Sequence, residues 1–135
     1  MTRKEYIKAN HQWLADKAKE EGVSKLAPGT YYKVLATGDA TRPSPNAASI
    51  VTVHYTGRTI DGNVFDDSRT TPDAPPVALR LRELIDGWQD ALVQMHPGDK
   101  WELYLAAEAA YGDASLPGIR GGSTLIFEIE LCGIA

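Results

Sequence analysis

Apolar side chains recur near helical spacing at the start of the chain. The recurring positions are Ile7, Leu14 and Ala18, with Tyr6 and Trp13 beside them. Thr2 followed three residues later by Glu5 is typical of a capping box, and Gly22 is typical of a helix end. The pattern predicts a helix over residues 3–21, with a charged outer side that carries Lys4, Lys8, Asp16, Lys19 and Glu20.

The apolar side of this helix needs a partner, because a Trp and a Tyr are costly to leave in water. Two interpretations stay open. The helix packs on its own domain, or it pairs with a second chain to form a homodimer. The pattern divides the chain into an N-terminal helical extension, residues 1–26, and a main domain, residues 27–135.

From Tyr31 onwards the apolar positions alternate, which favours strands over helices. Strands are predicted over residues 31–36, 50–59, 64–65, 77–81, 100–106 and 124–134. Asp61-Gly62 is a tight-turn signal that joins two of them into a hairpin. Residues 37–48 and 69–76 are rich in proline and lack periodicity, which predicts loops.

One further helix is predicted in the main domain. Five apolar residues would lie on one side of this helix: Leu84, Ile85, Trp88, Leu92 and Met95. Gly87 would cost about 1 kcal/mol inside a helix, so we place the helix start at about Gly87. This order of elements predicts an α+β fold, in which a single sheet wraps around one short helix.

The composition is that of one globular domain with an appendage: 135 residues, 43% hydrophobic and 24% charged. A net charge of −4 provides no basic field to attract nucleic acid or anionic lipid. No apolar run approaches the roughly 20 residues needed to span a bilayer, so no membrane insertion is expected. No secretory signal is visible, which favours a cytoplasmic location, or a periplasmic one if a leader was removed.

Conventional reaction chemistry is poorly represented. The histidines His11, His54 and His96 lack the spacing and the acidic or cysteine neighbours of a metal site, so no metal is predicted. The single Cys132 lies in an apolar run and fits a packed strand residue better than a nucleophile. Gly118, Gly121 and Gly122 lie close together but without the lysine of a phosphate-binding loop. No cofactor is therefore predicted.

Four aromatic residues occur where turns meet strands: Tyr55, Phe65, Trp88 and Tyr111. Singly, each fits a core position. They lie in four of six ordered motifs: His-Tyr-Thr-Gly (54–57), Asp-Gly-Asn-Val-Phe-Asp (61–66), Glu-Leu-Ile-Asp-Gly-Trp (83–88), Met-His-Pro-Gly-Asp-Lys-Trp (95–101), Ala-Tyr-Gly (110–112) and Thr-Leu-Ile-Phe-Glu-Ile-Glu-Leu (124–131). In this order the chain resembles the FKBP-type peptidyl-prolyl cis-trans isomerases from about Gly29 onwards.

The resemblance implies a twisted antiparallel sheet curled around the 88–95 helix, with one proline-binding pocket between them. The residues it assigns to catalysis are Trp88 as the floor, Tyr55, Phe65 and Phe127 as walls, Tyr111 as a hydroxyl donor and Asp66 as the pocket carboxylate. Before the resemblance is considered, Asp66 beside Asp67 fits a solvated turn. The resemblance also implies that Leu84 and Ile85 form the rim, and that the Ile85 N–H is available to a substrate carbonyl.

Two places differ from the usual family pattern. Val77 matches a wall position that is often aromatic in relatives. In the loop that follows Tyr111, relatives commonly carry Ile-Pro-Pro or Ile-Pro-Asn where this chain has Arg120-Gly121-Gly122. We expect Val77, Leu116, Ile119 and Arg120 to contact substrate, with the charge of Arg120 near the rim.

The implied activity is isomerisation of X-Pro bonds in peptides and unfolded proteins, by a bacterial-type enzyme that assists protein folding. Rapamycin-like macrolides are implied as further ligands. Two alternatives stay open: a module that binds proline segments or macrolides with little turnover, and a dimeric chaperone joined through the N-terminal helix.

Overall fold

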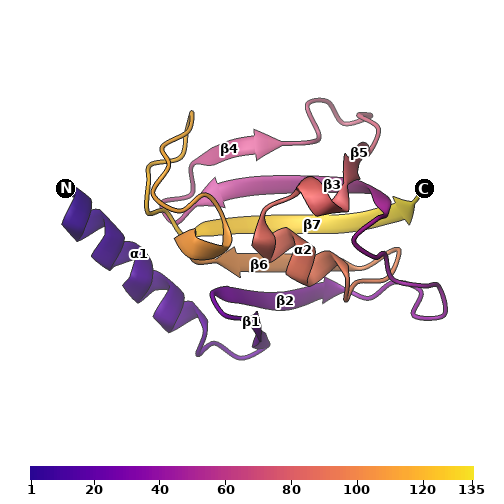
Figure 1. The fold of residues 1–135 in the computed structure, drawn as a ribbon, viewed down its shortest axis with the longest axis horizontal. Coiled ribbons are helices and arrows are strands. Elements are labelled where there is room, and N and C mark those ends of the chain that lie inside the picture. Colours follow the sequence, from indigo (N-terminus) through magenta and orange to yellow (C-terminus); the bar gives the residue numbers. More distant parts are fainter.

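A seven-stranded antiparallel sheet dominates the structure, a computed structural model that describes residues 1–135 (Figure 1). Its strands are β1 (Val23–Ala27), β2 (Thr30–Ala36), β3 (Ile50–Thr59), β4 (Val64–Asp67), β5 (Val77–Arg80), β6 (Lys100–Leu105) and β7 (Leu125–Ile134). The spatial order is β1-β2-β6-β7-β3-β4, and β5 also pairs with β3. The α+β prediction is confirmed.

Alternation along the strands gives the sheet two different faces. On β7, Phe127 and Ile129 are buried on one face, whereas Glu128 and Glu130 are partly exposed on the other. The apolar face carries the core, in which residues of β3, β6 and β7 pack together with α2. The pocket described below opens on this apolar face.

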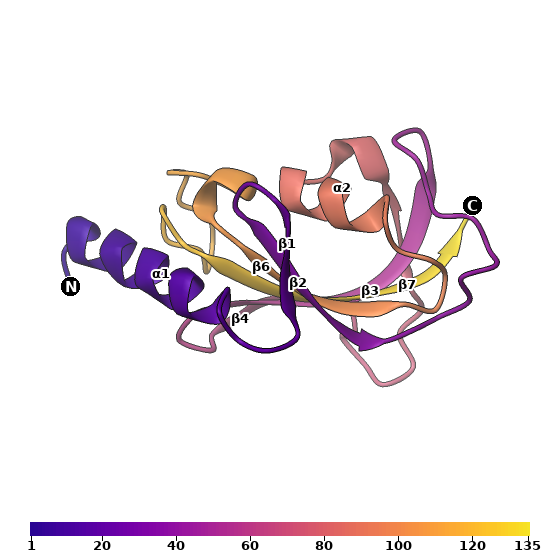
Figure 2. The ribbon, with the colours of Figure 1, turned by 90° about the horizontal axis from the view of Figure 1, so that it is seen from below.

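The short helix α2 (Asp86–Leu92) covers the concave face of the curved sheet (Figure 2). A 3-10 turn, η1 (Leu81–Glu83), leads from β5 towards it. Gly87 lies inside the helix, and a Cβ atom there would collide with the Leu105 side chain of β6. The glycine therefore allows α2 to approach the sheet closely, which compensates for its low helix propensity.

The N-terminal helix α1 (Arg3–Lys17) begins with the predicted capping box, in which the Thr2 side chain accepts from the Glu5 N–H and the Glu5 side chain accepts from the Thr2 N–H. It ends four residues before the predicted Glu21. The chain then turns into β1, a short strand that the sequence pattern did not predict. Figure 1 shows α1 at the end of the sheet opposite the C-terminus.

The apolar side of α1 packs on its own domain. The Trp13 and Tyr104 rings lie 6.0 Å apart, and Leu14 is buried beside Tyr104 and Ile126. Asn10 is fully buried, and its side-chain oxygen accepts a hydrogen bond of 2.8 Å from the Thr124 N–H. Of the two interpretations of this helix, packing within the chain is confirmed. Neither helix is long and apolar enough to cross a membrane.

Candidate active site

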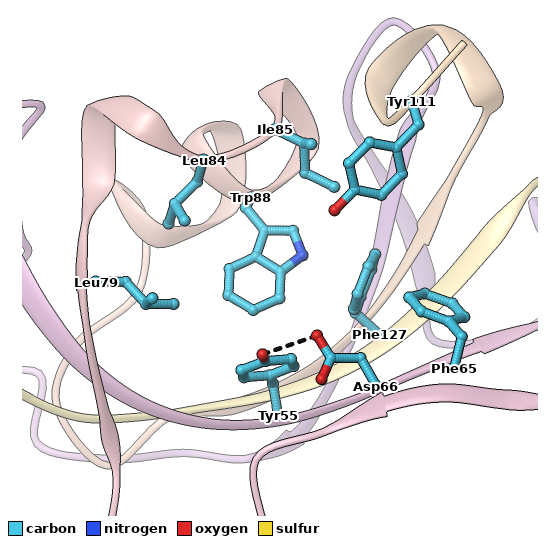
Figure 3. Close-up of a pocket in the computed structure, with 9 residues that line it drawn as sticks. All are labelled: Tyr55, Phe65, Asp66, Leu79, Leu84, Ile85, Trp88, Tyr111 and Phe127. Carbon is cyan, nitrogen blue, oxygen red and sulfur yellow. Dashed lines mark hydrogen bonds between the residues drawn. The ribbon is translucent and has the colours of Figure 1, made fainter. Parts of the chain in front are cut away.

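An apolar pocket of about 150 Å³ lies between α2 and the concave face of the sheet. Nine residues line it: Tyr55, Phe65, Asp66, Leu79, Leu84, Ile85, Trp88, Tyr111 and Phe127 (Figure 3). All but Asp66 are hydrophobic. The structure thus brings together eight of the twelve residues predicted for the site, which come from five separate segments of the chain.

The aromatic rings of the pocket are packed edge to face around Trp88. The ring centroid of Trp88 lies 5.0 Å from that of Tyr55 and 5.2 Å from that of Phe127, with interplanar angles of 79° and 85°. Phe65 meets Phe127 at 5.7 Å and 89°. Edge-to-face contacts of this kind fix each ring against the next. Trp88 is 96% buried, as its relative exposure of 4% shows, and forms the floor on which a small apolar ring could rest.

Gly57 of β3 makes this ring arrangement possible. A Cβ atom at Gly57 would lie 2.7 Å from carbon atoms of both Phe65 and Phe127. Gly57 pairs with Asp66 of β4 on one side and with Phe127 of β7 on the other. The absence of a side chain therefore lets the two phenylalanine rings meet across β3.

Asp66 is bound to the pocket wall by a hydrogen bond. The Tyr55 hydroxyl donates to Asp66 Oδ2 at 2.9 Å (Figure 3). Burial, and then this hydrogen bond and the Asp66 charge, raise the pKa of Tyr55 to about 12. Burial and the Asp66 charge also raise the pKa of Tyr111. Both phenols therefore stay protonated, as hydrogen-bond donors, at neutral pH.

Three polar hydrogens in or beside the pocket have no acceptor within the chain. The Ile85 N–H, at the N-cap of α2, makes no hydrogen bond, and neither does the Tyr111 hydroxyl. The Trp88 indole nitrogen is the one buried side-chain nitrogen or oxygen without a partner. Figure 3 shows the Tyr111 hydroxyl directed towards the space above Trp88. The Trp88 indole is buried, where a donor is normally satisfied, whereas Tyr111 is exposed and Ile85 partly exposed. All three donors are free to meet acceptors on a bound molecule.

The other four predicted site residues lie outside the pocket lining. Val77 was expected at the pocket, but Leu79, two residues later on the same face of β5, lines it instead. Ile119 is buried in the core, and Leu116 is exposed. Arg120 lies over the Tyr6 ring of α1, so its charge is directed to the helix instead of the pocket rim.

The lining carries one carboxylate and no histidine or cysteine, so it has no metal-ligand set and no base paired with a nucleophile. No group of three His, Cys, Asp or Glu residues elsewhere is placed to hold a metal ion. What the pocket offers is apolar enclosure and a few directed hydrogen-bond donors. This combination suits the binding and distortion of a neutral group better than proton or group transfer.

Comparisons with known proteins point to one family. The family described as "FKBP-type peptidyl-prolyl cis-trans isomerase" matches residues 42–132. The chain is 40% identical over 123 residues to the peptidyl-prolyl cis-trans isomerase Mip of Coxiella burnetii, covering 90% of this chain and 52% of that one. It is 39% identical over 123 residues to a Legionella longbeachae protein named outer membrane protein MIP, covering 90% and 51%.

A solved structure extends the match over the whole chain. The crystal structure of a peptidyl-prolyl cis-trans isomerase from Pseudomonas syringae pv. tomato is similar with a TM-score of 0.88 and 34% identity, covering 100% of this chain and 97% of that one. By contrast, the chain spans about half the length of the two curated relatives named above.

Proposed function

The chain belongs to the FKBP-type peptidyl-prolyl cis-trans isomerases, and from this membership we propose that its aromatic pocket accelerates rotation about X-Pro bonds in peptides and unfolded proteins. The observation that carries the proposal is the pocket itself. Five aromatic side chains enclose a space floored by Trp88, and the free Ile85 N–H and Tyr111 hydroxyl stand beside it.

Rotation about an X-Pro bond needs no bond to a nucleophile. The barrier is about 18–20 kcal/mol and arises from amide resonance, and the uncatalysed step takes roughly tens to hundreds of seconds. In the twisted transition state the amide loses its charge-separated resonance form. An apolar pocket therefore destabilises the planar, more polar ground state relative to the twisted one. Trp88, Tyr55, Phe65 and Phe127 supply this environment around the prolyl ring.

Directed hydrogen bonds hold the substrate in the reactive geometry. In our proposal the Ile85 N–H donates to one substrate carbonyl and the Tyr111 hydroxyl to another, while Leu79 and Leu84 contact the apolar side chains of the peptide. A thousandfold acceleration requires about 4 kcal/mol of differential stabilisation, which packing and one or two such bonds can supply.

Asp66 has a supporting role in this proposal. No proton has to leave the substrate, so a general base is not needed. Asp66 accepts from Tyr55 and thereby fixes that wall, and its charge polarises the pocket near the Tyr111 hydroxyl. We therefore expect its neutralisation to reduce activity less than truncation of Trp88 or Phe65.

Ligands, assembly and location are finer proposals. A rapamycin-like macrolide would compete with peptide for the same pocket.

A homodimer through α1 would have to use the outer side of the helix, because the inner side packs on the sheet. Light scattering of the full chain tests this assembly. The relative named as an outer membrane protein fits a periplasmic location, and the cytoplasmic location favoured from the sequence has no support from the comparisons.

The activity is tested by a protease-coupled assay with a proline tetrapeptide. The full chain should accelerate cis-to-trans conversion by at least a hundredfold at micromolar concentration, roughly a 3 kcal/mol lower barrier. A chain that folds normally by circular dichroism, binds the peptide and gives no acceleration would instead be the binding module with little turnover, and the enzyme proposal would be rejected.

A further inference from the structure

Helix α1 holds the loop that follows Tyr111, here called the 112–123 loop. Arg3 forms an ion pair with Asp113 at 3.1 Å, and Ile7 lies against Gly122, where a Cβ atom would approach Ile7 Cγ1 to 2.7 Å. Beyond the loop, the Thr124 N–H donates to Asn10. The first half of α1 thus contacts both ends of this loop, although the two segments lie more than 100 residues apart in sequence.

A further set of contacts joins Tyr6 to Arg120. The Arg120 guanidinium lies over the Tyr6 ring, 4.6 Å from its centroid, and donates to the Met1 carbonyl at 3.3 Å. The Ser123 hydroxyl donates to the Arg120 carbonyl at 2.5 Å, so its single proton is used there. The Tyr6 hydroxyl must then donate to Ser123 Oγ, at 2.6 Å. Tyr6 therefore holds Arg120 in two ways. Its ring contacts the Arg120 side chain, and its hydroxyl reaches the Arg120 carbonyl through Ser123.

The two residues before Arg120 reach the pocket wall. Ile119 is buried in the same core cluster as Trp88 and Phe127. Gly118 has a φ of +78° and lies against Phe65, so that a Cβ atom at Gly118 would approach Phe65 Cβ to 2.9 Å. Residues 118–120 therefore connect the helix on one side to the Phe65 wall on the other.

Phe65 depends on this support because its own strand is weakly held. Strand β4 has only four residues, lies at the edge of the sheet, and pairs with β3 over three residue pairs interrupted by a bulge. The neighbours Val64 and Asp66 are exposed. Packing from the loop therefore supports the Phe65 ring beside its edge-to-face contact with Phe127.

We propose that Tyr6 is a positioning residue for the pocket: it fixes Arg120, and thereby seats Gly118 and Ile119 against the Phe65 wall. The helix is then part of the isomerase unit and more than an appendage to it. The inference rests on the proposed function for its effect on turnover, but its structural part, the link from Tyr6 to Phe65, stands apart from any activity.

The chain offers a direct probe of this link, because Phe65 and Phe127 are its only phenylalanines. Incorporation of fluorophenylalanine gives one ¹⁹F signal for each of two pocket walls. Tyr6→Ala removes both connections to Arg120, whereas Arg120→Ala removes the cation over the Tyr6 ring and keeps the Ser123 hydrogen bonds and the buried side of α1. Arg120→Lys keeps a cation over the ring. Lys17→Ala is the matched control, since Lys17 lies over the Trp13 and Tyr104 rings at the far end of the same helix.

In Tyr6→Ala and Arg120→Ala, the Phe65 signal should move or broaden more than the Phe127 signal, and kcat/KM should fall about threefold to tenfold. Arg120→Lys should recover most of the wild-type Phe65 signal and most of kcat/KM. Lys17→Ala should change neither the Phe65 signal nor kcat/KM. An unchanged Phe65 signal in both alanine variants would overturn the inference, as would equal effects of Lys17→Ala. If the wild-type chain shows no turnover, the proposed function fails, and the Phe65 signal alone decides the inference.

Discussion

The two faces of the sheet differ in whether their polar groups have partners within the chain. On the concave face, a pocket lined almost wholly by hydrophobic side chains has the Ile85 N–H, the Tyr111 hydroxyl and the Trp88 indole N–H in or beside it, all without partners in the chain. On the opposite face, charges are paired. Two pairs join neighbouring strands, Arg58 with Glu102 at 3.4 Å and Lys100 with Glu128 at 2.9 Å, and a third joins Arg69, just after β4, to Glu130 at 2.9 Å.

A tyrosine paired with a carboxylate occurs on each face. Tyr55 donates to Asp66 in the pocket at 2.9 Å, and Tyr104 donates to Glu102 on the other face at 2.6 Å. Tyr104 is almost fully buried under α1, whereas Tyr55 borders the pocket. The same chemical pair thus serves packing on one face and a binding space on the other. In the proposed function, unsatisfied donors around an apolar space distinguish the face that binds substrate from the face that only stabilises the fold.

Removing the pocket floor should have the largest effect. Trp88→Leu should lower kcat/KM at least a hundredfold, because the ring that supports the prolyl group is lost. Trp88→Ala would also cost stability, about 3–5 kcal/mol for a buried Trp. The leucine variant, measured below its melting temperature in the protease-coupled assay, separates the two effects. Retained activity in a folded Trp88→Leu protein would remove the pocket from the mechanism.

Removing the free backbone donor should have an intermediate effect. Ile85 has φ −59° and Leu84 before it has ψ 161°, so proline fits at position 85 without backbone strain. Ile85→Pro deletes the N–H, whereas Ile85→Ala trims the side chain and keeps it. We expect Ile85→Pro to have a kcat/KM roughly threefold to tenfold below that of Ile85→Ala, the worth of one hydrogen bond. Equal values for the two variants would exclude a role for this N–H.

Removing the two tyrosine hydroxyls should have the smallest effects, of opposite kinds. Tyr55→Phe should lower kcat/KM about threefold and leave stability nearly unchanged. Tyr104→Phe should leave kcat/KM unchanged and lower the free energy of unfolding by about 1 kcal/mol, since a buried hydrogen bond is lost. Urea unfolding and the peptide assay on both variants check the pair, and a loss of activity in Tyr104→Phe would contradict the division between faces.

The pairing of Tyr55 with Asp66 also predicts how the free energy of unfolding depends on pH. The pKa of Tyr55 is raised to about 12, above its ordinary value of 10.0, first by burial and then by Asp66. The folded chain keeps a proton that the unfolded chain loses above pH 10, so this contribution to stability is complete below pH 10 and is lost as the pH rises through 12. Tyr55→Phe should therefore lose less stability than wild type as the pH rises from 10 to 12.

Local alternation was sufficient to predict most of the sheet. Strand β3 has the predicted bounds, because its β-branched residues alternate between a tight turn and a loop. Strand β1 was missed because only Val23, Leu26 and Ala27 in it are apolar, too few to show a period. Helix α2 ends at Leu92 and not at Met95, since residues 94 and 95 form i to i−3 hydrogen bonds to Ala91 and Leu92.

The site was predictable where motifs carry it and not where long-range contacts decide it. The ordered motifs located eight pocket residues, and the alternation of β5 placed Leu79 on the same face as Val77 but could not say which reaches the pocket. Arg120 was expected at the rim from its place in the loop. Its partner Tyr6 lies 114 residues earlier, and no local pattern links the two. The predicted division after residue 26 falls within β1 and stays a prediction.

In the proposed function, one pocket both binds proline and speeds rotation about the X-Pro bond. Exchange NMR on a proline peptide with the fluorophenylalanine-labelled chain measures both at once, without a protease. We predict exchange cross-peaks between cis and trans signals of the peptide, together with saturable shifts of the Phe65 and Phe127 signals, and loss of both in Trp88→Leu. Exchange that persists in folded Trp88→Leu, or that occurs while neither phenylalanine signal moves, would contradict the account.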